Sequence, residues 1–270
     1  MNNMLKRVFS AIIGISLCVF ALFFNKITRI TLLVVIAVIA VFEMSKALKN
    51  KNINCLKYIL IIYVIGFTVL ELLELGNTFN LCLLILCFIP MLLFGFKNSK
   101  FSYEDIIYSF FMFIYPVAPC CLLISVGTKE NGLFLIVFTF VASWLCDCFA
   151  QIGGMLFGKH KLIPDISPKK TIEGCIAGLM SFVVSGTIMY FSAKYTFKIQ
   201  LPLYISYIAA FACSIFGQIG DLTASYFKRY TGVKDFGNLI PGHGGVLDRF
   251  DSIILSLPIT YFIITMTHII

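Results

Sequence analysis

Long apolar runs alternate with short polar segments along the whole sequence. We identify nine such runs, at residues 8–24, 30–45, 57–75, 78–96, 106–126, 132–157, 174–191, 201–220 and 252–269. A helix of about 20 apolar residues crosses the hydrocarbon core of a bilayer, with a range of about 17–25. The sequence lacks the alternation of apolar and polar residues with regular turns that is typical of transmembrane barrels. The pattern therefore predicts an all-α, polytopic integral membrane protein with about nine transmembrane helices.

Composition supports this class and excludes others. Of the 270 residues, 60% are hydrophobic and 13% are charged, whereas soluble domains carry about 45–50% apolar and about 25% charged residues. So few charges cannot cover a globular surface, which excludes an ordinary soluble enzyme and a disordered protein. The ten Cys residues include no C-x-x-C pair and indicate apolar packing rather than a disulfide framework or a zinc site.

The basic residues indicate how the runs are oriented. If all nine runs cross the membrane, sixteen of the 21 Lys and Arg residues fall on the side of the N-terminus. Loops rich in Lys and Arg stay in the cytoplasm, so we expect a cytoplasmic N-terminus and an outside C-terminus in the cytoplasmic membrane. Because the basic residues are spread over short loops, the net charge of +8 favours a membrane surface and an anionic substrate as partners, and no nucleic acid.

The acidic residues divide the chain into two regions. Six of the seven Asp residues lie between positions 147 and 251. We therefore expect residues 1–130 to form a hydrophobic transmembrane scaffold. Residues 131–270 are expected to form a catalytic transmembrane region, with cytoplasmic loops at 158–173 and 221–251.

The segment 220–252 contains three features in sequence. Asp221, Ser225 and Lys228 share one face of a helix, and Asp248 and Asp251 share one face at the start of the last run. Between them, PGHGG at 241–245 lets backbone N–H groups approach a phosphate. Carboxylates from two helices suit Mg²⁺, which also keeps water and phosphate ligands. The combination favours metal-assisted phosphoryl chemistry over the alternative, a solvated connector with a simple helix cap.

A second polar cluster lies at 147–174. Asp147 is an ionisable group late in an apolar run, which marks a functional candidate. Lys169, Lys170 and Thr171 of the segment SPKKT are suited to grip a polyphosphate. The alternative is that Asp147 pairs structurally with a lysine and that SPKKT starts a helix.

Both clusters resemble one family. The segments 147–174 and 225–252 are similar to the two signature blocks of the phosphatidate cytidylyltransferase (CDP-diglyceride synthase) family. The matching residues of the second block are Ser225, Lys228, Arg229, Lys234, Asp235, Pro241, Gly242, His243, Gly244, Gly245, Asp248, Arg249 and Asp251. Gln151 and Cys148 depart from the family pattern near Asp147.

The resemblance implies a specific reaction and cofactor. It implies phospholipid biosynthesis by transfer from CTP to phosphatidate, which gives CDP-diacylglycerol and pyrophosphate, in a homodimeric membrane enzyme with a cytoplasm-facing active site. It implies Mg²⁺, with a potassium ion (K⁺) beside it. Asp221 and Asp248 match the metal-site carboxylates, and Ser225 and Lys228 complete the expected catalytic set.

The expected mechanism is in-line attack of the lipid phosphate on the α-phosphorus of CTP. Metal and basic side chains neutralise the two anions. The residues expected to bind substrate are Asp147, Lys169, Lys170, Thr171, Arg229, Lys234, Asp235, His243, Gly244, Arg249 and Asp251.

Two other function classes stay open. A transporter or channel would also suit nine spans and Asp147, although the acids gather at one membrane face and no broken-helix pair recurs in the two halves. Another membrane enzyme that uses CTP, such as a polyprenol or archaeal-lipid kinase or cytidylyltransferase, would share the phosphate chemistry.

Overall fold

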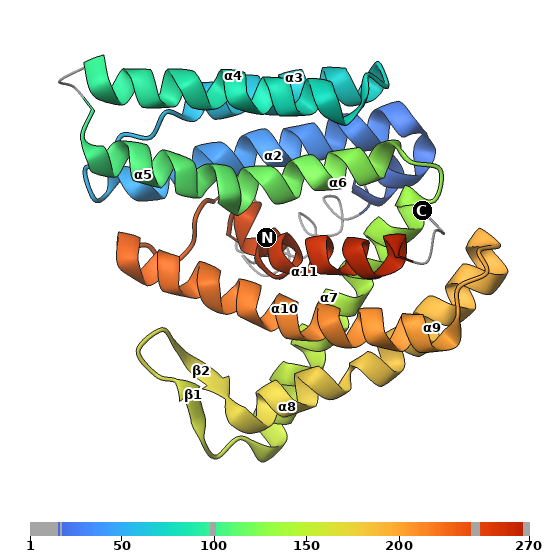
Figure 1. The fold of residues 1–270 in the computed structure, drawn as a ribbon. Coiled ribbons are helices and arrows are strands. Elements are labelled where there is room, and N and C mark those ends of the chain that lie inside the picture. The colour runs from blue at the N-terminus through green and yellow to red at the C-terminus, as the bar shows by residue number, and fades with distance from the viewer. Residues whose placement is uncertain (1–15, 17, 98–100, 239–243, 267–270) are drawn as a thin grey trace, which may run out of the picture. The chain divides into compact units, whose positions relative to one another are not determined.

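The computed structural model describes residues 16, 18–97, 101–238 and 244–266 (Figure 1). Most of these residues are helical, and among them strands occur only in a two-stranded hairpin. The chain divides into two compact units. The first unit comprises Met1–Thr128 with Tyr230–Arg249, and the second comprises Lys129–Arg229 with Phe250–Ile270.

The first unit is built from an antiparallel set of apolar helices. These are α2 (Lys26–Lys49), α3 (Lys57–Leu72), α4 (Gly76–Lys97), α5 (Tyr103–Met112), the π-helical turn η1 (Phe113–Val117) and α6 (Ala118–Thr128). Helix α2 packs against α3 and α6, and α3 packs against α4 (Figure 1). Asn25 and Ser102 cap α2 and α5 by accepting hydrogen bonds from backbone N–H groups three residues ahead. Fully buried side chains such as Leu33, Met44, Leu60 and Ile124 form the core of this unit.

The second unit combines long helices with the hairpin. Its elements are α7 (Gly132–Phe157), β1 (Lys161–Ile163), β2 (Ser167–Thr171), α8 (Ile172–Met180), α9 (Phe182–Ser192), the π-helical turn η2 (Ala193–Phe197), α10 (Leu203–Thr231) and α11 (Leu247–Thr265). The last two residues of α10 and the first three of α11 belong to the first unit. The strands β1 and β2 pair antiparallel, with Lys161 opposite Thr171.

Helices α7 and α8 lie against each other along small residues. A Cβ atom on Gly174 would lie 2.6 Å from the carbonyl oxygen of Ala150 and 3.1 Å from Cα of Gly154. Gly154 and Gly158 on one segment, and Gly174 and Gly178 on the other, have the G-x-x-x-G spacing that lets membrane helices approach closely. The approach holds the hairpin, which connects these two helices, at the end of α7.

Several helical segments are long and apolar enough to cross a membrane. Within the described residues these are Lys26–Lys49, Tyr103–Thr128, Gly132–Phe157, Ile172–Phe197 and Leu203–Thr231. Large apolar side chains such as Ile62, Leu86 and Ile114 are more than 60% exposed, as expected for surfaces that face lipid. The protein is therefore an all-α, multi-pass membrane protein.

The remaining apolar runs have different outcomes. The runs 57–75, 78–96 and 252–269 coincide largely with α3, α4 and α11, and most of the run 8–24 lies outside the described residues.

The expected loops need correction. Residues 221–231 are helical because α10 continues to Thr231, and the segment 158–173 contains the hairpin, which the sequence pattern did not predict. SPKKT forms β2, and its last residue, Thr171, is also the N-cap of α8.

Candidate functional site

Asp221 forms an ion pair with Lys170 in the second unit. Helix α10 positions Asp221, and β2 brings Lys170 to it, so that the ammonium nitrogen lies 2.6 Å from a carboxylate oxygen. Both side chains are between a quarter and a third exposed, so water or a ligand reaches the pair. One helical turn further on, the Ser225 hydroxyl donates a long hydrogen bond of 3.5 Å to the other Asp221 oxygen. The structure thus joins both predicted clusters at Asp221.

A second polar contact in this unit centres on Ser252. Its hydroxyl donates to Asp147 at 3.4 Å and to Asp251 at 3.5 Å, and its backbone N–H donates to Asp251 at 2.8 Å. Asp147 comes from α7, whereas Asp251 and Ser252 come from α11. Two carboxylates that the sequence placed about one hundred residues apart therefore share one hydroxyl group.

Asp251 is the buried acid of this group, with 9% of its surface exposed. It precedes the predicted span 252–269. Burial raises the pKa of its carboxyl group, the neighbouring Asp221 carboxylate raises it further, and Lys228 acts in the opposite direction. Carboxylates that repel one another in this way attract a cation, and Lys170 already supplies one positive charge to Asp221. The arrangement fits a hard cation with few protein ligands.

The hairpin residues are tied to the helices around them. The Thr171 hydroxyl accepts a hydrogen bond from the backbone N–H of Gly174 at 3.1 Å and caps α8. Arg229 donates through Nε to the carbonyl oxygen of Ile166 at 3.2 Å, and Glu173 accepts from His160 Nδ1 at 2.7 Å. Lys169 is exposed on β2. Thr171 therefore serves the helix start, and Lys170 is the hairpin lysine that contacts Asp221.

In the first unit, Asp248 organises the described residues on both sides of the PGHGG segment at 241–245, which we name the glycine turn after its sequence alone. Its Oδ2 atom accepts hydrogen bonds from the backbone N–H groups of Phe236 at 2.8 Å and of Gly245 at 2.9 Å. Gly244 has a φ of +85°, a left-handed conformation that glycine adopts without strain. One carboxylate oxygen of Asp248 thus holds the backbone on both sides of residues 239–243.

Glu43 is a site residue that sequence reasoning missed. It lies on α2, is 8% exposed, and accepts hydrogen bonds from the backbone N–H groups of Val246 at 3.0 Å and Leu247 at 2.8 Å. Its position near the end of the apolar run 30–45 indicates an interfacial residue when the sequence is taken alone. The signal that could have found it is its position inside an apolar run, where an unpaired carboxylate is costly.

The other expected site residues differ in exposure and position. Lys234, Asp235 and Arg249 are exposed, and Lys228 is half-buried on α10. His243 lies outside the described residues, with Pro241 and Gly242. Asp221 belongs to the second unit and Asp248 to the first. Across the described part of the chain, no three or more His, Cys, Asp or Glu side chains form a cluster able to hold a metal. A Mg²⁺ ion here would therefore have one or two carboxylate ligands, with water and substrate phosphate as the others.

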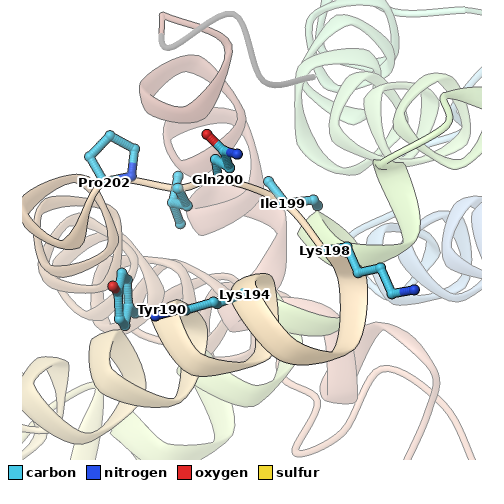
Figure 2. A pocket seen from close by; sticks show the side chains of 7 residues that line it. Tyr190, Lys194, Lys198, Ile199, Gln200 and Pro202 are labelled. Atoms are coloured by element: carbon cyan, nitrogen blue, oxygen red, sulfur yellow. The ribbon is translucent and has the colours of Figure 1, made fainter.

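A surface hollow lies apart from these residues. It has a volume of about 550 Å³ at the connection of α9 and α10 and is lined by Tyr190, Lys194, Lys198, Ile199, Gln200, Leu201 and Pro202 (Figure 2). None of the expected site residues lines it. In Figure 2 the Lys198 side chain points away from Tyr190, so the two lysines do not converge on one point.

Comparison with known proteins shows what this chain is similar to. Proteins named phosphatidate cytidylyltransferase from Staphylococcus haemolyticus, Staphylococcus saprophyticus and Staphylococcus aureus are 43%, 42% and 40% identical to this chain over 166, 168 and 168 residues. Each alignment covers 62% of this chain and 59% of the relative, so the chain matches about three fifths of the relatives' length. The model of the cytidylyltransferase family matches residues 5–267. This chain therefore belongs to the cytidylyltransferase family.

Proposed function

We propose that this protein is a phosphatidate cytidylyltransferase, which converts CTP and phosphatidate to CDP-diacylglycerol and pyrophosphate in phospholipid biosynthesis. Family membership supports the reaction class, and the names of the relatives support the lipid substrate. The structural observation that carries the proposal is the Lys170–Asp221 pair, with 2.6 Å between ammonium and carboxylate. A carboxylate next to a partly exposed lysine supplies one group for a metal and one for a phosphate.

In this reaction a phosphate oxygen of phosphatidate forms a bond to the α-phosphorus of CTP. The bond between the α-phosphorus and its bridging oxygen breaks, and pyrophosphate leaves with the electron pair. No protein nucleophile is needed, since the lipid phosphate is already an oxyanion. Lys169 and Lys170 bind the triphosphate, while Lys228, Arg229 and Arg249 stabilise the charge that develops on the transferred phosphate.

Asp221 and Asp248 are the proposed ligands of Mg²⁺, with Ser225 and Lys228 beside them. When bound, Mg²⁺ neutralises the phosphate oxygens. Support comes from the partly exposed position of the Lys170–Asp221 pair and from the Asp221 carboxylate that helps to raise the pKa of the buried Asp251. The K⁺ ion remains an expectation from the resemblance alone. Asp147, Asp251 and the exposed Lys234 and Asp235 belong to the proposed substrate site, as do Thr171, His243 and Gly244.

The proposal extends to the membrane arrangement. It places about nine spans in the cytoplasmic membrane, with the N-terminus and the active site on the cytoplasmic side, the C-terminus outside, and two chains in a homodimer. The charge distribution of the loops supports the orientation. CTP would reach such a site from the cytoplasm, and phosphatidate would reach it without leaving the bilayer.

The test measures transfer of labelled CTP to phosphatidate in mixed micelles by the purified full chain. We expect CDP-diacylglycerol to form and its formation to stop when EDTA removes the metal. Asp248→Asn and Asp221→Asn should each lower the transfer rate by at least about 100-fold. Asn retains an oxygen that can accept from Phe236 and Gly245, so Asp248→Asn removes the charge and leaves the backbone contacts possible.

Asp165→Asn, which changes an exposed acid of the hairpin turn, is the matched control and should keep the wild-type rate. An Asp248→Asn protein that transferred at the wild-type rate would disprove the metal assignment. A panel of other lipid phosphates identifies the acceptor. Transfer to polyprenyl phosphate in place of phosphatidate would assign a different cytidylyltransferase.

A further inference from the structure

Glu43 is a buried carboxylate on an apolar helix, and the structure shows why it is there. Its two oxygens each accept one backbone hydrogen bond, from Val246 and from Leu247. These N–H groups belong to the start of α11, where they have no partner within the helix. The negative charge also lies at the positive end of the α11 dipole. A side chain of α2 therefore caps a helix about two hundred residues further along the chain.

The backbone next to the glycine turn is shaped around the same carboxylate. A Cβ atom on Gly237 or on Gly245 would collide with the Glu43 carboxyl group. The three heavy atoms nearest to a Cβ atom on Gly237 all belong to Glu43, so Glu43 is the first side chain that a substitution there would displace. Glu43 thus lies against the described residues on both sides of this segment, 236–238 and 244–248.

Glu43 and Asp248 divide the backbone donors of these flanks between them. Asp248 accepts from Phe236 and Gly245, and Glu43 accepts from Val246 and Leu247. Three consecutive N–H groups, at 245, 246 and 247, are therefore held by two carboxylates from different helices. Loss of Glu43 would release the start of α11, which carries Asp248.

We propose that Glu43 is a positioning residue for the transfer reaction, which holds Asp248 in place through the start of α11 and the flanks of the glycine turn. The inference rests on the proposed function. Glu43 touches backbone and not substrate, so its effect on the reaction passes through Asp248. Removal of such a supporting contact typically lowers activity or metal affinity about 10–100-fold.

The first experiment compares Glu43→Gln with Glu71→Gln. Gln at position 43 has the size of Glu, but its NH₂ group would face one of the backbone N–H donors of Val246 and Leu247, so one of the two hydrogen bonds is lost. Glu71 is a matched control, because it is also a carboxylate on an apolar helix, and its oxygens accept from the side chains of Asn80 at 2.8 Å and Ser125 at 2.9 Å. We expect kcat of Glu43→Gln to fall about 10–100-fold, with KM for CTP near the wild-type value, and Glu43→Asp to regain part of the loss.

Two results would overturn the inference. One is a kcat for Glu43→Gln equal to that of Glu71→Gln. The other is a lowered melting temperature with an unchanged kcat per folded enzyme, which would mean that Glu43 only stabilises the fold.

A double-mutant cycle tests the contact itself. Gly237→Ala should lower kcat in the wild-type chain, since the new Cβ atom displaces Glu43. In a Glu43→Ala background, Gly237→Ala should lower kcat only slightly further, because the space taken by the Glu43 side chain is then open. Losses that multiply in the double variant would mean that Gly237 and Glu43 act independently, which contradicts the inference.

Hydrogen exchange separates this inference from the proposed function. The backbone amides of Val246 and Leu247 should exchange faster in Glu43→Gln than in Glu71→Gln, whether or not the protein transfers CTP. A wild-type chain without transfer activity would reject the proposed function. Unchanged exchange at Val246 and Leu247 would reject the role of Glu43.

Discussion

The ammonium group of Lys170 lies 2.6 Å from Asp221, at the position that a cation would take next to this carboxylate. A lysine and a metal ion compete for the same oxygen when only one fits. Substrate phosphates offer Lys170 another partner, and a metal offers Asp221 another cation. The exchange of partners is a consequence of the proposed function that can be measured at a single residue.

Lys170→Gln should separate metal binding from nucleotide binding. We expect the variant to bind Mg²⁺ up to about fivefold more tightly without nucleotide, since a partly exposed ion pair contributes at most about 1 kcal/mol. Its KM for CTP should rise, because the charge that binds the triphosphate is lost. Mg²⁺-dependent thermal stabilisation measures the first effect and initial rates measure the second.

Lys161→Gln is the control for this prediction, because Lys161 is an exposed lysine of the same hairpin. Its Mg²⁺ affinity and its KM should equal those of the wild type. If Lys170→Gln behaved like Lys161→Gln in both measurements, the ion pair would have no part in binding either ligand.

Site residues differ in how far the sequence alone could identify them. Asp147 stood out because a charge inside an apolar run is costly, and Asp221 stood out because it shares a helical face with Ser225 and Lys228. Their partners were not predictable, since Lys170 and Ser252 lie about fifty and one hundred residues away. Glu43 was misinterpreted because its position near the end of an apolar run is typical of a residue at the membrane interface.

At the level of elements, the hairpin is the main departure from the expected pattern. Its strands are three and five residues long, too short for an alternation of apolar and polar residues to be recognised. Tertiary contacts hold it, since Glu173 accepts from the start of the hairpin and Arg229 donates to its turn. The hairpin matters because β2 carries Lys170 and ends at the cap of α8.

Thr171→Ala tests the role of this cap. We expect the free energy of unfolding to fall by about 1 kcal/mol, because the backbone N–H of Gly174 loses its acceptor. Thr171→Ser should restore most of the loss, since serine offers the same hydroxyl. Thermal unfolding in detergent measures both. A Thr171→Ala protein with wild-type stability and a raised KM for CTP would instead assign Thr171 to the nucleotide.

Helix α10 illustrates why helix ends were predicted poorly. The apolar run ends near position 220, but the helix continues to Thr231. Ala224 and Phe227 remain buried, so packing continues the helix after the membrane-like composition has ended. The spacing of Asp221, Ser225 and Lys228 predicts that they share one helical face, and α10 contains all three residues.

For the whole molecule, the sequence predicts a topology that reporter fusions can test. A fusion after residue 165 should report the cytoplasm, and one after residue 130 should report the outside, because the excess of Lys and Arg stays inside. A C-terminal fusion should also report the outside. A C-terminal reporter in the cytoplasm would show an even number of spans and contradict the predicted nine.

The sequence by itself determined the membrane class, the helical architecture and the region of the acidic chemistry. These follow from hydropathy and from the cost of charge near lipid, both of which act on local segments. Only the tertiary structure decided that Lys170 pairs with Asp221, that Ser252 joins Asp147 to Asp251, and that Glu43 caps α11. Such contacts join distant positions, and they depend on how helices pack rather than on the composition of any one of them.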